Sequence, residues 1–145
     1  MKIISPSFKD GDPIPVRYTP AGKNIAPPLK FSDVPRQTMS LVIMVEDLGG
    51  QAGTWTHWLI WNIPANTEYI PSGLVPPGAN QGVNSFGTIG YSGPHPISGR
   101  HAYFFRLIAL NIRINLSQGA SREQLEKETF GHILDEAELV AYYGQ

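Results

Sequence analysis

The sequence of 145 residues contains no cysteine, which excludes disulfide bonds, thiolate metal sites and a cysteine nucleophile. Charged residues make up only 16%, against the usual ~25%, so the chain is not a highly charged, disordered tail protein. A basic excess is also missing, because 11 Lys and Arg oppose 12 Asp and Glu for a net charge of −1. Proteins that bind nucleic acid by neutralising phosphates normally carry that excess, so we predict no nucleic-acid partner.

Long apolar runs are absent as well. No stretch approaches the ~18 apolar residues of a transmembrane helix, and Ser5, Pro6 and Ser7 interrupt the N-terminal segment before it reaches signal-peptide length. We therefore expect a soluble, cytoplasmic protein without a transmembrane segment; a periplasmic location would require a leader that precedes this sequence. No internal repeat or low-complexity linker divides the chain, which predicts a single domain over residues 1–145.

Glycine and proline are abundant, with 15 and 13 residues, and both disfavour helices, so a β-rich architecture is favoured. Three apolar runs rich in β-branched and aromatic residues are too short for comfortable helices. They are predicted to be adjacent central strands of one sheet, buried on both faces. These runs are Ser40–Glu46, Trp58–Ile63 and His101–Leu110.

Three shorter segments are also predicted to be strands: Lys2–Ile4, Val16–Thr19 and Leu29–Phe31. Residues 71–100 hold most of the turn-forming residues, and so long an irregular stretch in a compact domain is usually functional.

One helix of about two turns is predicted after Ser121, a good N-cap residue with Gln124 at the capping-box position. The apolar residues of His132–Tyr143 fit both a helical stripe and one face of a strand, so periodicity leaves both structures open for this segment.

Asp47, His57 and His101 lie at the ends of the three predicted central strands, with Trp55, Tyr91 and Tyr103 nearby in the sequence. A single histidine in such a position is usually satisfied by a backbone carbonyl. Three polar residues that interrupt apolar strands favour a shared cleft at one edge of the sheet, because each would cost ~1–3 kcal/mol if buried without partners.

Such a cluster could serve three kinds of chemistry: a metal triad, general acid–base catalysis, or anion binding by imidazoles. The nearby Gly93-Pro94 loop fits anion binding best, because a glycine lets the backbone approach a ligand and offer its N–H. We therefore expect His57 and His101 to converge on one anion, with Asp47 orienting one imidazole and the Gly93 region supplying a backbone donor.

Several motifs in order and spacing resemble the phosphatidylethanolamine-binding protein family, the superfamily of the Raf kinase inhibitor protein, in its short prokaryotic branch. The resemblance covers nearly the whole chain. The matching segments are 16–19, 24–29, residue 47, 53–64, 84–87, 90–96, 99–107 and 131–140.

The resemblance implies a mostly β fold: a large central antiparallel sheet packed against a smaller sheet, with one or two short helices near the C-terminus. It also implies that His132–Tyr143 is a strand. The family's hallmark is a small pocket for phosphate, phosphoryl headgroups or acetate-like anions. By position, the pocket residues are Asp47, His57, Gly93, Pro94, His101 and Tyr103, with Trp55 as a wall aromatic and Tyr91 beside them.

The chain departs from the family pattern after Asp47. The family run Asp-Pro-Asp-Ala-Pro is replaced by residues 47–51, Asp-Leu-Gly-Gly-Gln, which lack the second carboxylate and both prolines. We expect residues 47–53 to form a mobile loop that tolerates anions better and cationic groups worse. Ala102 stands where the family often has Arg. The sequence ends at Gln145 without the helix that covers the pocket in mammalian members, so we expect a more open mouth.

These observations favour a non-enzymatic binding or regulatory protein with a small anionic ligand and no cofactor or metal. The resemblance implies a protein partner, a kinase or serine protease, that this protein would inhibit. A homodimer stays an open alternative. The competing reading is a hydrolase or metal-dependent enzyme that uses His57, His101 and Asp47. It is disfavoured because no Ser, Cys or Thr nucleophile stands in a recognisable setting.

Overall fold

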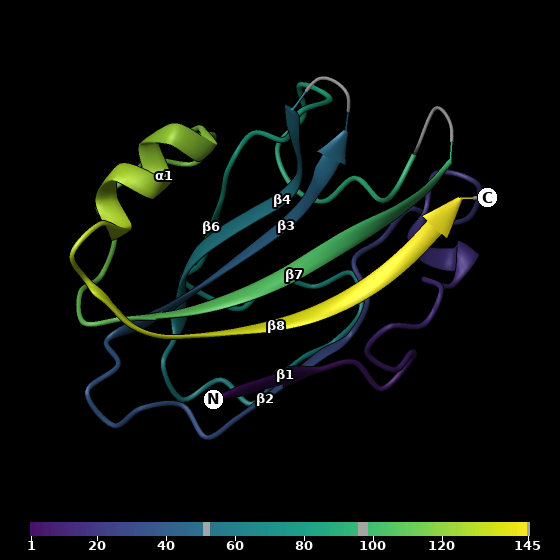
Figure 1. Ribbon diagram of the computed structural model, residues 1–145. Coiled ribbons are helices and arrows are strands. Elements are labelled where there is room, and N and C mark those ends of the chain that lie inside the picture. Colours follow the sequence, from purple (N-terminus) through teal and green to yellow (C-terminus); the bar gives the residue numbers. More distant parts are fainter. Residues whose placement is uncertain (51–52, 96–98, 145) are drawn as a thin grey trace.

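The computed structural model describes residues 1–50, 53–95 and 99–144 (Figure 1). Most of the regular structure is β, in two antiparallel sheets. The elements are β1 (Lys2–Ile4), η1 (Val16–Tyr18, a 3₁₀ helix), β2 (Leu29–Ser32), β3 (Ser40–Gly50), β4 (Gly53–Pro64), β5 (Tyr69–Ile70), β6 (Asn80–Gln81), β7 (Arg100–Leu110), α1 (Arg122–Thr129) and β8 (Ile133–Gly144).

The large sheet has the strand order β6-β4-β3-β7-β8, and every neighbouring pair is antiparallel. This confirms that the three long apolar runs are adjacent strands of one sheet. It also confirms the strand that the resemblance implies for the C-terminal segment, because β8 pairs with β7 along almost its whole length. β4 extends beyond its predicted apolar run at both ends, whereas β3 extends beyond its run at the C-terminal end only.

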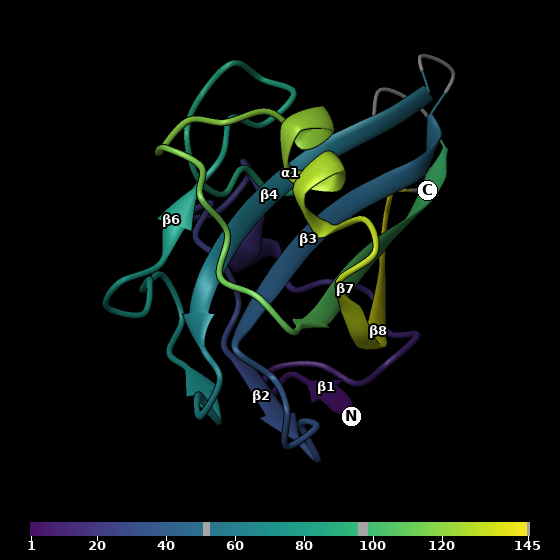
Figure 2. The same ribbon diagram turned by 90° about the vertical axis from the view of Figure 1, so that its left-hand side faces the viewer.

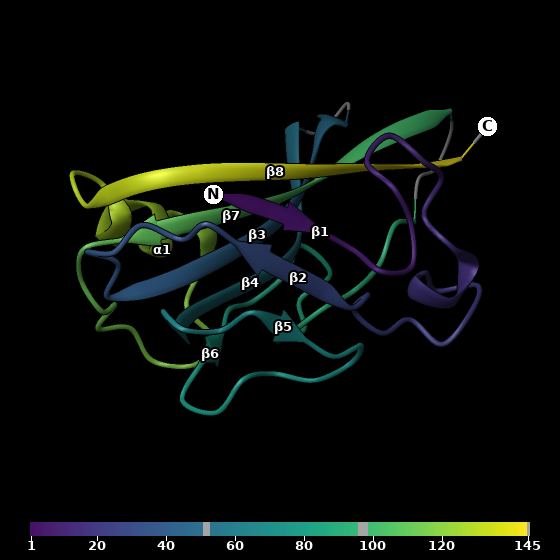
Figure 3. The same cartoon turned by 90° about the horizontal axis from the view of Figure 1, so that it is seen from below.

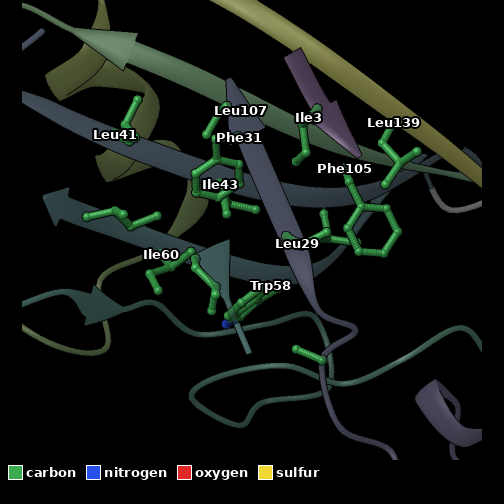
Figure 4. Packing of buried hydrophobic residues seen from close by; sticks show 14 of the residues in the cluster. Ile3, Leu29, Phe31, Leu41, Ile43, Trp58, Ile60, Phe105, Leu107 and Leu139 are labelled. Carbon is green, nitrogen blue, oxygen red and sulfur yellow. The ribbon is translucent and has the colours of Figure 1, made fainter. Parts of the chain in front are cut away.

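A smaller sheet, β1-β2-β5, packs against one face of the large sheet (Figure 3). The alternation of buried and exposed residues in β2 turns Leu29 and Phe31 toward the large sheet and leaves Lys30 and Ser32 exposed. The main core fills the space between the two sheets (Figure 4). Its members include Ile3, Leu29, Phe31, Ile43, Trp58, Ile60, Phe105, Leu107 and Leu139.

The opposite face of the large sheet is covered by α1 (Figure 2). Leu125 of α1 is fully buried in a second apolar cluster. The strand residues of this cluster include Met44, Leu59 and Ile108. The predicted capping box is confirmed: the Ser121 side chain accepts from the backbone N–H of Gln124, and the Gln124 side chain accepts from the N–H of Ser121. None of the helices in the described parts of the chain is long and apolar enough to cross a membrane.

The predicted strand at Val16–Thr19 is wrong, because Val16–Tyr18 forms the 3₁₀ helix η1 instead. The Thr19 hydroxyl and backbone N–H both donate to the carbonyl of Val16, at 2.8 Å and 3.0 Å. Such a local side-chain bond offers the backbone an alternative to strand pairing. The turn brings the Tyr18 ring into the main core.

The predicted loop over residues 47–53 is largely strand. Residues 47–50 belong to β3, and β4 begins at Gly53, so the two strands form a hairpin that continues past the apolar runs. Residues 51–52 lie outside the described residues, and the predicted mobility of this segment stays a prediction.

A buried carboxylate joins α1 to the large sheet. Glu46 of β3 is fully buried, and its two oxygens accept from Arg106 of β7, at 3.0 Å, and from Arg122 of α1. The arginines reach the surface and pair there with Glu136, at 2.8 Å, and Glu126, at 2.8 Å. A buried charge of this kind depends on its partners, because losing one leaves the other uncompensated.

We predict that Glu46→Gln lowers the free energy of unfolding by about 3 kcal/mol, the cost of breaking a buried ion pair from one side. Glu136→Gln is the matched control, because it removes a carboxylate from the same arginine at a position that is 47% exposed, where pairs contribute ~1 kcal/mol or less. Urea unfolding of both variants measures the difference. Equal losses would show that Glu46 does not hold α1 in place.

Candidate functional site

Three strands bring the predicted polar residues together at one end of the large sheet. Asp47 on β3 is in register with Tyr103 on β7, and His101 lies two residues before Tyr103 on the same face. The imidazole of His57 on β4 lies edge-on to the ring of Tyr103, with 5.1 Å between ring centroids. We call Asp47, His57, His101 and Tyr103 the histidine cluster. The sequence-based expectation that these residues share one site is consistent with this arrangement.

His57 reaches the cluster through an irregularity in strand pairing. Val45 pairs with Trp58, but the next residue of β3, Glu46, pairs with Thr56, so His57 is one extra residue in β4. Such a bulge re-aims side chains, which otherwise alternate between the two faces of a sheet. His57 and Trp58 can therefore both lie on the face that carries Asp47, although they are neighbours in sequence.

The imidazole of His101 is held by Asp47. Nδ1 of His101 lies 2.6 Å from Oδ2 of Asp47, and the other carboxylate oxygen, Oδ1, accepts from the backbone N–H of Gly49 at 3.0 Å. Asp47 is only 5% exposed, so these hydrogen bonds compensate a nearly buried charge. Because an ionised carboxylate only accepts, Nδ1 of His101 carries the hydrogen. Asp47 thus orients one imidazole, as the sequence-based hypothesis requires.

His57 is anchored to the main chain instead. Its Nδ1 lies 2.7 Å from the carbonyl oxygen of Ser92, and its side chain is almost completely buried. Burial lowers the pKa of His57 below its ordinary value of 6.5, against the opposing effects of the Ser92 carbonyl, the Asp47 charge and the Gly93 carbonyl. At neutral pH His57 is therefore uncharged, with its one hydrogen on Nδ1.

Tyr103 keeps its phenolic hydrogen throughout the physiological range. Burial raises the pKa of Tyr103 well above its usual value, and the negative charge of Asp47 and the neighbouring Tyr143 raise it further. Tyr143 faces His101 across the β7–β8 pair. The sequence analysis missed Tyr143, because its segment could not be assigned to a strand, and therefore to a register with His101, from periodicity alone.

Gly93 has a different role from the one predicted. Its N–H donates to Oδ1 of Asn24 at 2.7 Å, so this N–H is already used, and the backbone donor predicted from the Gly93 region stays a prediction. A Cβ at Gly93 would lie 2.0 Å from the carbonyl oxygen of Tyr18 and 2.9 Å from Cα of Thr19. Glycine is thus required for close packing of this segment on η1, not for the approach of a ligand.

Tyr91 and Pro94 belong to the same packed segment. The hydroxyl of Tyr91 donates to the carbonyl of Tyr18 at 2.6 Å, and its ring lies edge-on to Trp58. Burial raises the pKa of Tyr91 far above its usual value, so this donor is permanent. Pro94 is buried. Tyr91 therefore supports the segment that carries Ser92, and the Ser92 carbonyl in turn holds His57.

Aromatic rings line one side of His57. Phe86 lies 5.5 Å from the imidazole and 5.3 Å from the ring of Trp55, the predicted wall aromatic. Phe86 is 40% exposed, so its ring borders both the buried histidine and the solvent. The sequence analysis did not single out Phe86, because a lone aromatic within an irregular segment carries no periodic signal.

The chemistry available to the cluster is limited by these bonds. Both oxygens of Asp47 and the Nδ1 atoms of both histidines already have partners. Within residues 1–50, 53–95 and 99–144, no group of three or more His, Asp or Glu side chains is placed to hold a metal ion. The arrangement presents polar ring atoms and a phenol beside aromatic side chains.

The comparisons with known proteins agree on one family. The family model for phosphatidylethanolamine-binding protein matches residues 4–144. The UPF0098 protein of Methanothermobacter thermautotrophicus is 43% identical over 148 residues, covering 99% of this chain and 98% of its own. That of Pyrococcus horikoshii is 44% identical, covering 97% of this chain and 75% of its own.

Two solved structures share the fold with a TM-score of 0.93 each. One is the crystal structure of a phosphatidylethanolamine-binding protein homologue from Chlamydia trachomatis, 38% identical, with 99% of this chain and 97% of that chain covered. The other is E. coli YbcL, a member of the mammalian PEBP family, 28% identical, with 99% and 98% covered. These matches confirm the predicted fold class.

We predict that Gly93→Ala destabilises the protein by about 3 kcal/mol, the upper range for overpacking, because its Cβ would meet backbone atoms that cannot rotate away. Gly49→Ala is the control on the other side of the cluster. Its Cβ would lie 3.8 Å from the nearest atom, Oδ1 of Asp47, and should change stability by no more than about 0.5 kcal/mol. Thermal unfolding of both variants tests this, and a neutral Gly93→Ala would contradict the packing account.

We also predict that His57 makes the fold sensitive to acid. The unfolded chain takes up this proton near pH 6.5, whereas the folded protein resists it, so stability falls as the pH drops below about 6.5. One such proton contributes a slope of at most ~1.4 kcal/mol per pH unit. His57→Gln should reduce this slope between pH 7.5 and 5, measured by urea unfolding, while His132→Gln, outside the cluster, should not. An unchanged slope in His57→Gln would refute the assignment.

Proposed function

The chain belongs to the phosphatidylethanolamine-binding protein family, and we propose that it is a binding protein whose histidine cluster holds a small anion, either phosphate or a phosphoryl group. The fold positions the cluster, and membership of a family named for phosphatidylethanolamine binding supports a ligand that carries a phosphoryl group.

One observation carries the proposal: each imidazole is anchored through Nδ1 to an acceptor of the protein. Ser92 holds His57, and Asp47 holds His101. Anchoring through one ring nitrogen fixes the direction of the other, a preorganisation that lowers the entropic cost of binding. The protonated phenol of Tyr103 lies against both rings, at 5.1 Å from His57 and 6.5 Å from His101 between centroids.

The charge balance of the cluster is compatible with an anion. Asp47 is the only carboxylate of the cluster, and hydrogen bonds from Gly49 and His101 compensate its charge. Loss of the second acidic residue of the family pattern removes a repulsive charge from the segment after Asp47. An anion therefore meets fewer negative groups here than the family pattern would present.

Binding is favoured over hydrolysis by the surroundings of His57. A hydrolytic base needs a hydroxyl nucleophile or a positioned water within hydrogen-bond reach. In the described part of the chain, His57 hydrogen-bonds to a carbonyl and contacts aromatic rings, and no hydroxyl donates to it. Inhibition of a partner kinase or serine protease stays a prediction from the resemblance.

The test is a titration with inorganic phosphate, followed by calorimetry, of the wild type, His101→Ala and His132→Ala. We expect His101→Ala to weaken phosphate binding roughly 10- to 150-fold, the equivalent of about 1.5–3 kcal/mol for a hydrogen bond to a charged group. His132→Ala is the matched control, because His132 pairs with Asn111 next to the opposite end of β8. Equal affinities of the wild type and His101→Ala would contradict the proposal.

A further inference from the structure

Tyr143 of β8 borders the histidine cluster at the edge of the large sheet. It is the direct cross-strand partner of His101, and Ala141, two residues earlier, is the partner of Tyr103. The end of β8 runs beside the start of β7 (Figure 1). Directly opposed residues of an antiparallel pair have Cβ atoms only about 4.5–5.5 Å apart, on the same face of the sheet. Tyr143 therefore stands on the face that carries the cluster.

The side chain of Tyr143 is partly buried beside the cluster. It packs against the main core, and it is one of the groups that raise the pKa of Tyr103, so the two phenols are electrostatic neighbours. Tyr142 lies on the opposite face, where the guanidinium carbon of Arg100 is 4.4 Å from the centre of its ring. Of the two adjacent tyrosines, only Tyr143 belongs to the face of the cluster.

The N–H groups closest to the cluster are already in use. Nδ1 of His57 and Nδ1 of His101 each donate to an oxygen of the protein, and the backbone N–H of Gly93 donates to a side-chain oxygen. A phosphate presents oxygens in several directions, so other side chains must supply part of its hydrogen bonds. A phenol suits this role, because its O–H donates without carrying a charge.

The hydroxyl of Tyr143 is available as such a donor. Among the residues that the structure describes, none forms a hydrogen bond with it. The hydroxyls of Tyr18 and Tyr91, by contrast, donate to Ser7 and to a main-chain carbonyl, at 2.7 Å and 2.6 Å. Those two tyrosines are therefore committed to packing, whereas the Tyr143 hydroxyl is not.

We infer that Tyr143 is a ligand-contact residue of the anion site and donates its phenolic hydrogen to a phosphate oxygen from the side of β8. This inference rests on the proposed anion binding, and it adds β8 to the strands that supply the site. The same hydrogen can be donated to free phosphate and to the phosphoryl group of a larger ligand. Phosphate oxygens are the chemistry that both sources share.

The experiment titrates the wild type, Tyr143→Phe and Tyr142→Phe, as full chains, with inorganic phosphate by calorimetry at pH 8. Tyr143→Phe should bind phosphate roughly 10-fold more weakly, because it loses one hydrogen bond to a charged group. Tyr142→Phe is the matched control, since it removes the same atom from the adjacent residue on the opposite face, and its affinity should stay within about 2-fold of the wild type. Both variants keep the ring and its packing.

A second titration with dimethyl phosphate represents the lipid-headgroup source of the same chemistry. The loss in Tyr143→Phe should appear with this probe as well, and the ratio of the wild-type affinities distinguishes the free source from the headgroup source. Carbon-13 NMR of protein labelled at tyrosine Cζ adds a direct readout. The signal that disappears in Tyr143→Phe should shift when phosphate is added to the wild type, whereas the signal that disappears in Tyr142→Phe should not.

The outcomes separate this inference from the proposed function. Phosphate that binds the wild type and Tyr143→Phe with equal affinity would overturn the role of Tyr143 while leaving anion binding intact. Equal losses in Tyr143→Phe and Tyr142→Phe, or a Tyr143 signal that saturating phosphate leaves unchanged, would also overturn that role. Failure of both probes to bind the wild type would overturn the proposed function itself.

Discussion

The one extra residue in β4 at His57 determines what this end of the large sheet presents. Without it, strict alternation would place His57 on the face opposite Trp58, beneath α1, where Glu46 and its arginines lie. With it, the imidazole turns to Tyr103 and the carbonyl of Ser92. The extra residue thus places the His57 side chain on the face that carries Asp47, where regular alternation would not place it.

Adjacent residues of β3 serve opposite faces. Glu46 points to α1 and holds the helix through Arg122, whereas Asp47 points to the other face and holds His101. Both carboxylates are buried, and each has at least one donor from an element distant in sequence. The packing of α1 and the arrangement of the histidine cluster therefore both depend on two adjacent residues of β3, Glu46 and Asp47.

The apolar runs were sufficient to predict the three long central strands, and the polar residues at their ends predicted that Asp47, His57 and His101 lie together. Asp47, His57 and His101 each interrupt a long apolar run, and antiparallel neighbours bring such positions together at one end of the sheet. Gly93 was predicted to let a ligand approach the backbone, whereas the atoms that approach it are the backbone of Tyr18 and Thr19, which no local pattern reveals. Asn24 and Gly93 are also far apart in the sequence, so no local pattern could predict their contact.

Local competition accounts for the other differences. The Thr19 hydroxyl favours a 3₁₀ turn over a strand, and the extra residue at His57 in β4 leaves no signature in composition or periodicity. Phe86 lies in an irregular segment, so its contact with His57 follows from tertiary packing alone. Site geometry here depends more on loop packing and strand register than on the residue types that the sequence displays.

The most direct test of this account is the position of the ring hydrogen of His57. Nitrogen-15 NMR of histidine-labelled protein at neutral pH distinguishes a protonated ring nitrogen from one with a lone pair. The account predicts a protonated Nδ1 and an unprotonated Nε2 in the free protein, with the Nε2 signal shifting when inorganic phosphate is added. A hydrogen on Nε2 in the free protein, or an Nε2 signal that saturating phosphate leaves unchanged, would contradict it.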